Sequence, residues 1–254
     1  RSCNCYFYEL GSRLGLDRMS YWLSWFGIGQ AIPSGMDGAS GNTEAIVSGS
    51  VLDENFRESL RQSGEATFES VMMSIGQGRL TWTPLHAADA YATLARGGKR
   101  FPPTLVRGHR GRLNREEFPD REIPKVVVDT ILEGMREGVS ESWGTGSRIK
   151  YGPGDYEPIF NVPGVVVMGK TGTAQAPPWS RDVDGDGVIG KRERTAGLEH
   201  AWFVGLVGNA RDDKPRFAIA VLIEYGGSGG RVAGPVANQI IEALQSEGYL
   251  EVTE

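Results

Sequence analysis

The residues best suited to chemistry lie in one short segment, Lys170-Thr171-Gly172-Thr173, which sets a cation, two hydroxyls and a glycine side by side. Residues 164–168, directly before it, are rich in valine, which is typical of a buried β-strand. On a strand, Lys170 and Gly172 share one face, and Thr171 and Thr173 share the other. Glycine lets a ligand approach the backbone, and the neighbouring N–H groups and hydroxyls can hold an anion or a developing oxyanion. The segment therefore predicts an anion-binding strand, provided that the rest of the chain supplies matching groups.

The composition is that of an ordinary globular protein, with 254 residues of which 39 % are hydrophobic and 23 % charged, enough for one large domain. The net charge of −5, without a basic cluster that contains aromatic residues, argues against a nucleic-acid partner. The longest uncharged stretch, residues 19–36, is interrupted by polar residues and proline, so no membrane span is expected in this chain. Cys3 and Cys5 lie two residues apart and point away from each other, so no bridge between them is expected.

Several helices are expected to position the Lys170 segment. Thr83 as N-cap and Pro84 as the first helical residue begin one helix, which Gly97-Gly98 end. Other helices are expected over residues 5–26 in two pieces, after Pro124, and from about Pro235 to Gly248. The aromatic and leucine stripe of residues 5–26 is interpreted as core packing, residues 44–68 as a polar connection, and residues 103–108 as a short strand.

Two apolar runs after the Lys170 segment, residues 201–207 and 217–223, flank a short turn and predict an antiparallel hairpin. Helices followed by three strands and a terminal helix favour the α+β class, an antiparallel sheet with helices packed on it. His86 is interpreted as a surface or packing residue of its helix. His200 opens the strand next to the Lys170 strand, but no motif gives it a role.

Several motifs occur together and in a fixed order. Ser2-Cys3-Asn4 and Lys170-Thr171-Gly172 are two of the three signatures of serine penicillin-recognising enzymes. Longer segments accompany them: Phe26-Gly27-Ile28-Gly29-Gln30, Ser74-Ile75-Gly76-Gln77-Gly78, Thr83-Pro84-Leu85, Gly169 to Gln175, and Ala201-Trp202-Phe203-Val204-Gly205. Over nearly its whole length the chain thus resembles the transpeptidase domain of class B penicillin-binding proteins, and the elongation-type members most closely.

The resemblance implies a penicillin-binding-protein or serine β-lactamase-like transpeptidase fold and gives each motif residue a role. Ser2 would relay a proton to the leaving amine, and Asn4 would hydrogen-bond the acyl-side amide of the substrate. Lys170 would supply positive potential, and Thr171 and Thr173 would bind the terminal carboxylate of the substrate. The backbone N–H of Thr173 would form half of the oxyanion hole. The implied catalytic residues are Ser2, Asn4, Lys170 and Thr173, and the implied substrate-binding residues are Asn4, Thr171, Gly172 and Thr173.

The chain departs from the family pattern in the third signature, Ser-x-x-Lys. In the family, a Ser-x-x-Lys helix located before the Ser-x-Asn motif supplies the nucleophile and its general base. Here Ser-x-Asn begins at residue 2. The chain, residues 1–254, is therefore expected to be the C-terminal portion of the domain, either a truncated gene product or an expressed fragment. One Ser-x-x-Lys string does occur, Ser147-Arg-Ile-Lys150, but it lies in a glycine-rich loop after Ser-x-Asn and is interpreted as a chance match.

Residues 182–193, inside an inserted loop expected over residues 176–199, fit the twelve-residue calcium loop. Carboxylates stand at positions 1, 3, 5 and 12, glycine at position 6 and an aliphatic residue at position 8. The expected ligands of a structural Ca²⁺ are Asp182, Asp184, Asp186, the carbonyl of Val188, and Glu193, with a water bridged by Gly190. The alternative is an acidic turn whose charge is screened by neighbouring lysine and arginine. The flanking residues do not resemble the helices of a paired EF-hand.

The function that the resemblance implies is peptidoglycan D,D-transpeptidation, a serine acyl transfer that cross-links stem peptides and needs no cofactor. D,D-carboxypeptidase or class A bifunctional activity is a second interpretation, and a non-catalytic binding or scaffold module is a third. The implied partners are a stem peptide ending in D-Ala-D-Ala, β-lactams and the cell-wall elongation machinery. The implied location is extracytoplasmic, at the periplasmic face of the inner membrane, anchored through an N-terminal segment outside this chain.

Overall fold

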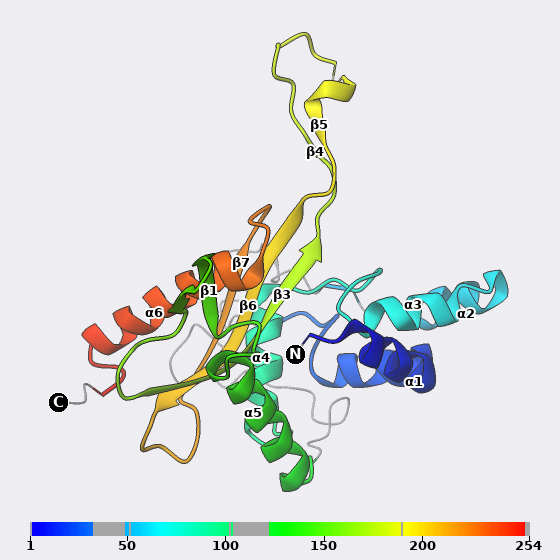
Figure 1. Cartoon of the computed structure of the whole chain (residues 1–254). Helices are drawn as coiled ribbons and strands as arrows, with labels where there is room; N and C mark the ends of the chain where they lie inside the picture. Colours follow the sequence, from blue (N-terminus) through cyan, green and yellow to red (C-terminus); the bar gives the residue numbers. More distant parts are fainter. Residues whose placement is uncertain are drawn as a thin grey trace, which may run out of the picture. The chain divides into compact units, whose positions relative to one another are not determined.

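The computed structural model describes residues 2–32, 49–50, 52–101, 103, 122–188 and 190–251 (Figure 1). It divides into two compact units, residues 2–132 and residues 133–254, and the division falls within one helix. Helices and antiparallel strands are both present, as the α+β prediction requires. The strand predicted over residues 103–108 lies outside the described residues, apart from residue 103.

The N-terminal unit is helical. It contains α1 (Asn4–Trp25), α2 (Glu54–Ser63), α3 (Ala66–Met73) and α4 (Pro84–Ala95). Helix α1 is broken at Gly15, where φ is 72°, and so forms the two pieces that the sequence predicted. The interpretation of residues 44–68 as a polar connection is wrong, because α2 and the start of α3 lie there. Helix α2 contains only two apolar side chains, Phe56 and Leu60, of which Leu60 is buried, so its composition resembles that of a polar connection.

Helices α1 and α3 pack closely at Gly11. A Cβ on Gly11 would lie 2.6 Å from the Ser74 Cβ and 2.8 Å from the Ser70 carbonyl oxygen. Beside this contact, the buried core of the unit contains Leu16, Leu52, Leu60 and Met73. Most of the stripe on α1 is not the core packing that the sequence predicted. Tyr6 is 64 % exposed, whereas Trp25, which is 4 % exposed, is buried. Hydrophobic periodicity identified the helix but not which of its apolar residues are covered.

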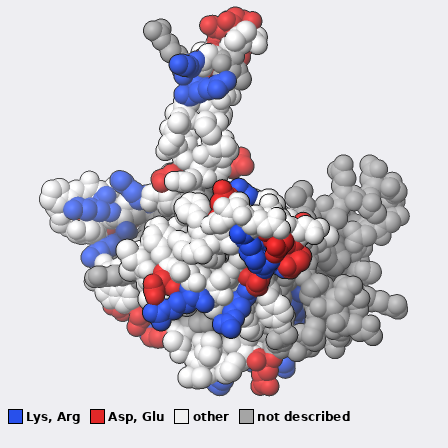
Figure 2. Space-filling model, turned by 90° about the vertical axis from the view of Figure 1, so that its right-hand side faces the viewer, with Lys and Arg blue, Asp and Glu red and all other residues white. Residues whose placement is uncertain are grey.

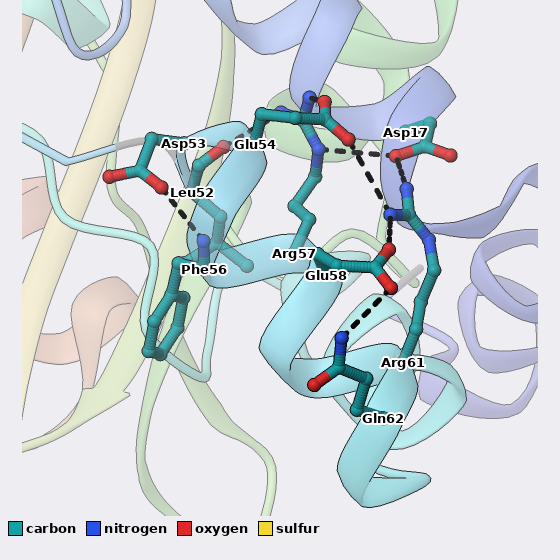
Figure 3. Close-up of polar contacts among 9 residues, drawn as sticks. All are labelled: Asp17, Leu52, Asp53, Glu54, Phe56, Arg57, Glu58, Arg61 and Gln62. Carbon is teal, nitrogen blue, oxygen red and sulfur yellow. Dashed lines mark hydrogen bonds and ion pairs between the residues drawn. The ribbon is translucent and has the colours of Figure 1, made fainter.

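Side chains of α2 bind α1 through a network of ion pairs (Figure 3). Asp17 of α1 forms ion pairs with Arg57, whose Nε lies 3.1 Å from its Oδ1, and with Arg61, which itself pairs with Glu58. Asp53 caps α2 by accepting from the Phe56 N–H at 2.8 Å. Exposed ion pairs contribute about 0–1 kcal/mol each. The Arg57 side chain is only 19 % exposed, so its pairs are the less screened ones.

The C-terminal unit is built on an antiparallel sheet of β3 (Val165–Gln175), β6 (Glu199–Asn209) and β7 (Phe217–Ile223), in the order β3-β6-β7. The predicted hairpin of residues 201–207 and 217–223 is confirmed by β6 and β7, which pair Phe203 with Val221. Strand β3 pairs with β6 alone in this sheet and is therefore an edge strand. Its register pairs Lys170 with Val204 and Thr171 with Phe203.

Further elements surround this sheet. Two short strand pairs, which the sequence did not predict, are β1 (Arg148–Gly152) with β2 (Asp155–Pro158), and β4 (Trp179–Ser180) with β5 (Arg194–Thr195). The 3₁₀ turn η1 (Lys191–Glu193) precedes β5, and the π-helical turn η2 (Gly229–Ala233) leads into α6 (Gly234–Ser246). Helix α5 (Lys125–Ser140) begins in the N-terminal unit and ends in this one.

The core of the C-terminal unit lies between the sheet and α6, which runs beside β7 and β6 in Figure 1. Phe203, Val207 and Val221 lie on one face of the sheet, because their positions in the paired strands have the same parity. Ala237 and Ile241 of α6 are fully buried against them. Thr171 and Thr173 share this face, so the core fixes the strand that carries them.

Helix α4 follows the prediction closely. The Thr83 hydroxyl accepts from the His86 N–H at 3.3 Å, and Pro84 is the first helical residue. His86 is buried and lies 2.7 Å by its Nε2 from the Gln30 carbonyl oxygen, so it is a packing residue of the helix start. Within the described residues, no helix is both long and apolar enough to cross a membrane.

Candidate active site

Lys170 lies on the edge strand β3 and is half-buried. Its Nζ donates to the carbonyl oxygen of Thr171 at 2.7 Å and lies 3.5 Å from the hydroxyl oxygen of Thr145. Burial lowers the pKa of the Lys170 ammonium below its usual value, because the charged form loses hydration. The cation is therefore held close to the strand backbone beside two threonines.

Thr171 forms the second part of the cluster. Its Oγ1 lies 2.8 Å from the Oγ1 of Thr145, a residue 26 positions earlier in the chain. Thr145 was not predicted as a site residue from the sequence. The one local feature that could have indicated it is its place between two glycines, Gly144 and Gly146, shortly before β1. The hydroxyls of Thr145 and Thr171 and the ammonium of Lys170 thus lie next to one another at β3.

The backbone approaches the strand closely at Gly172. A Cβ on Gly229, in the turn η2, would lie 2.2 Å from the Gly172 carbonyl oxygen and 2.4 Å from that of Trp202. The N–H of Gly229 donates to Thr173 Oγ1 at 3.3 Å. The sequence predicted that a ligand can approach the backbone at Gly172, and in the structure the turn η2 of the same chain lies against the backbone there. Thr173 is exposed, and this contact sets the position of its hydroxyl.

Ser2 and Asn4 lie at the start of α1, in the N-terminal unit, where both are exposed. The structure therefore brings Lys170, Thr171 and Thr173 together in one unit and places Ser2 and Asn4 near each other in the other unit. Cys3 between them is the N-cap of α1 and makes no side-chain capping bond.

Ser147, the serine of the Ser-x-x-Lys string, is buried, and its hydroxyl donates to the Gly144 carbonyl oxygen at 3.0 Å. Lys150 lies on β1 with its Nζ 5.7 Å from the ring centre of Tyr156. A nucleophilic serine needs an accessible hydroxyl within reach of its base. The geometry of Ser147 supports the interpretation of this string as a chance match.

The predicted calcium loop lies at the end of a strand-flanked arm that projects from β3 and β6 in Figure 1. Single carboxylate oxygens of Asp182, Asp184 and Glu193 lie within 4.8 Å of one another. Asp182 accepts from the N–H of Gly187, at position 6, at 2.8 Å, and Glu193 accepts from the Val183 N–H at 2.7 Å. Asp186 accepts from the Val188 N–H at 2.7 Å.

Hydrogen bonds from backbone amides favour the charged form of Asp182 and of Glu193. The Gly187 N–H lowers the pKa of Asp182, and the Val183 N–H lowers that of Glu193. The flanking elements are the strands β4 and β5 rather than helices. At the top of Figure 2, acidic side chains gather at the tip of the arm, with lysine and arginine next to them. The described basic residues of the arm are Arg181, Lys191 and Arg194.

Comparison with known proteins gives one consistent result. Residues 1–242 match the family model of the penicillin binding protein transpeptidase domain. Peptidoglycan D,D-transpeptidase MrdA of Acinetobacter baumannii is 32 % identical over 249 residues, which cover 92 % of this chain and 32 % of that protein. The chain therefore spans about a third of the length of that relative.

Solved structures agree with this match. The crystal structure of Pseudomonas aeruginosa PBP2 in complex with WCK 5153 superposes with a TM-score of 0.69 at 27 % identity, covering 100 % of this chain and 47 % of that one. A chain from the structure "Structural coordination of polymerization and crosslinking by a peptidoglycan synthase complex" gives a TM-score of 0.64 at 29 % identity, covering 99 % of this chain and 37 % of that one.

Proposed function

The chain belongs to the penicillin-binding protein transpeptidase domain family, and from this premise we propose that it is part of a peptidoglycan D,D-transpeptidase of the elongation type. The observation that carries the proposal is the cluster of Lys170, Thr171 and Thr173 on the edge strand β3, inside the segment that matches the family. Related proteins named D,D-transpeptidase support it.

The substrate group that this cluster suits is a carboxylate. The Lys170 ammonium supplies positive charge, and the hydroxyls of Thr171 and Thr173 can donate hydrogen bonds, which are stronger when the acceptor is charged. A stem peptide that ends in D-Ala-D-Ala carries such a carboxylate, and so does a β-lactam. Both ligands would therefore bind with the carboxylate against β3.

The chemistry follows as acyl transfer. A serine nucleophile attacks the carbonyl carbon of the penultimate D-Ala, and the bond from this carbon to the terminal D-Ala nitrogen breaks. Ser2 relays the proton to the leaving amine, and Asn4 orients the acyl-side amide. The backbone N–H of Thr173 stabilises the oxyanion. The amine of a second stem peptide then attacks the ester and releases the serine.

In this mechanism a Ser-x-x-Lys helix of the kind that the family uses would supply the nucleophile and its general base. The whole protein would work at the outer face of the cytoplasmic membrane, where peptidoglycan is cross-linked. Its partners would be other proteins of cell-wall elongation, which a similar chain in a peptidoglycan synthase complex supports.

The test of the proposal uses the full-length gene product that contains this chain. Thr171→Val keeps the side-chain volume and removes one hydroxyl, so acylation by a fluorescent penicillin should slow roughly 10-fold, the effect of one charge-assisted hydrogen bond. Lys170→Ala should slow it further, because the positive charge is lost. Wild-type rates in both variants, with unchanged melting temperatures, would show that β3 is not the substrate-binding strand.

We also propose that residues 182–193 bind one Ca²⁺ with a structural role. The four acidic side chains, the Val188 carbonyl and a water at Gly190 would supply the oxygen ligands. Three of the carboxylates already converge. Because the loop joins β3 to β6, a bound ion would also steady the end of the strand that carries Lys170.

Calorimetric titration of the chain with calcium tests this second proposal. A solitary loop should bind with a dissociation constant of about 10⁻⁴ to 10⁻³ M, as extracellular modules do. Asp182→Ala should abolish the heat of binding, whereas Asp155→Ala, which removes an exposed charge on β2, should leave it unchanged. If the wild-type chain gives no heat, the loop is an acidic turn.

A further inference from the structure

Thr145 contacts Lys170 and Thr171, and the proposed mechanism gives it no role. Its Oγ1 lies 2.8 Å from Thr171 Oγ1 and 3.5 Å from Lys170 Nζ, so it touches both the cation and one of the hydroxyls of the cluster. Thr145 comes from the loop between α5 and β1, and it is exposed. Thr145, from this loop, thus contacts both Lys170 and Thr171, the two side chains of β3 that would bind the carboxylate in the proposed function.

Close backbone contacts hold Thr145 in place. The Gly146 N–H donates to the Gly138 carbonyl oxygen at 3.0 Å. A Cβ on Gly144 would lie 2.4 Å from that same oxygen, and a Cβ on Gly230 would lie 2.6 Å from the Thr145 carbonyl oxygen. Real Cβ atoms do not approach backbone oxygens this closely, so the loop fits only because these positions are glycine. The position of the Thr145 hydroxyl is therefore set by α5 and η2.

A bound carboxylate would fix the direction of these hydrogen bonds. An ammonium group only donates, so Thr145 Oγ1 accepts from Lys170 Nζ, whereas either threonine hydroxyl can donate to the other. A carboxylate only accepts, so a Thr171 hydroxyl that binds one must direct its own hydrogen at it. Thr171 Oγ1 is then left as an acceptor, and among the described residues Thr145 is the only hydrogen-bond partner of this hydroxyl. Thr145 therefore donates to Thr171 in the arrangement that a carboxylate requires.

We infer that Thr145 is a positioning residue, which orients the Thr171 hydroxyl as a donor to the carboxylate of the substrate or β-lactam. The inference rests on the proposed function, in which Thr171 binds that carboxylate. Thr145 itself need not touch the substrate. It acts through Thr171, and successive hydrogen bonds that run in one direction strengthen one another.

The test compares acylation of the full-length protein by benzylpenicillin and by its methyl ester, which lacks the carboxylate charge. Thr145→Val should slow acylation by benzylpenicillin by up to roughly 10-fold, since the Thr171 hydroxyl is no longer held as a donor to a charged group, and should leave the rate with the ester unchanged. Thr145→Ser keeps the hydroxyl and should restore the rate. The double variant Thr145→Val/Thr171→Val should be no slower than Thr171→Val, because both changes remove the same interaction.

Thr130→Val is the matched control, because Thr130 is an exposed threonine of α5 whose hydroxyl donates to the Val126 carbonyl oxygen at 2.7 Å. It should react at the wild-type rate. Melting temperatures verify folding, and Thr145→Ala replaces Thr145→Val if the latter unfolds. A wild-type rate in Thr145→Val, or an equal loss with acid and ester, overturns the inference while a slow Thr171→Val still supports the proposed function. A wild-type rate in Thr171→Val overturns the proposed function itself.

Discussion

At the scale of single residues, the charge of the Lys170 side chain depends on how far burial removes it from water. A lysine with bulk hydration stays charged to a pH near 10.4. Burial lowers the pKa of Lys170, so its charge is lost at a lower pH than that of an exposed lysine. The carbonyl oxygen of Thr171 and the hydroxyl oxygen of Thr145 nevertheless accept hydrogen bonds from the Lys170 ammonium. The charge that would hold a substrate carboxylate in the proposed function therefore depends on pH.

The first prediction concerns this dependence. Lys170 is cationic below its lowered pKa and neutral above it, so acylation by benzylpenicillin should decline on the alkaline side at a pH below 10.5. Lys170→Arg keeps the positive charge at any such pH, since a guanidinium is not deprotonated in proteins. It should therefore move this decline to higher pH, whatever it does to the maximum rate. The pH profile of the second-order acylation rate measures this effect, and identical profiles would contradict it.

At the scale of elements, glycines set the distance between η2 and the sheet. The close approach of Gly229 to the carbonyl oxygens of Gly172 and Trp202 involves backbone atoms, which cannot rotate away as a side chain does. The turn η2 also leads directly into α6, whose Ile241 is fully buried. Any displacement of η2 would therefore disturb both the Thr173 hydroxyl and the core.

The second prediction tests this packing. Gly229→Ala should destabilise the protein by about 1–3 kcal/mol, the cost of overpacking a filled site, and should also slow acylation. Gly134→Ala is the control, because Gly134 lies in α5 with no other atom within 4 Å of the added Cβ. It should stabilise the protein by about 0.5–1 kcal/mol through helix propensity. Thermal unfolding measures both changes, and a tolerated Gly229→Ala would refute the account of η2.

At the scale of the whole molecule, the two signatures belong to two compact units. Ser2-Cys3-Asn4 lies in residues 2–132, and Lys170-Thr171-Gly172 lies in residues 133–254. Ser147, the serine of the Ser-x-x-Lys string, is buried, and its hydroxyl is bonded to a carbonyl oxygen. The proposed reaction would therefore need a nucleophile other than Ser147.

The third prediction follows. The 254-residue chain, incubated with a fluorescent penicillin and then denatured, should show no covalent band, whereas the full-length gene product should show one. In the proposed mechanism Ser2, Asn4, Lys170 and Thr173 would stabilise a tetrahedral intermediate, whereas the nucleophile of a Ser-x-x-Lys helix would begin its formation. A stoichiometric band from the chain alone that disappears in Ser147→Ala would contradict both the prediction and the interpretation of Ser147.

The sequence by itself determined the elements that carry strong local patterns. Valine-rich and other apolar runs predicted β3, β6 and β7, and Thr83, Pro84 and the glycines at 97 and 98 placed α4 correctly. The signature segments identified the family, because such motifs keep their residue types and spacing. Each of these signals lies within a short stretch of chain, where periodicity, capping and motif spacing are readable.

Only the tertiary structure showed which distant residues meet. Helix α2 was not predicted because Phe56 and Leu60 are its only apolar residues, and the exposure of Tyr6 depends on what covers α1 rather than on its pattern. The place of Thr145 beside Thr171 could not be predicted, because the contact joins residues 26 positions apart through a loop. Its geometry is decided by how α5, η2 and β3 pack, and local sequence patterns do not encode such long-range contacts.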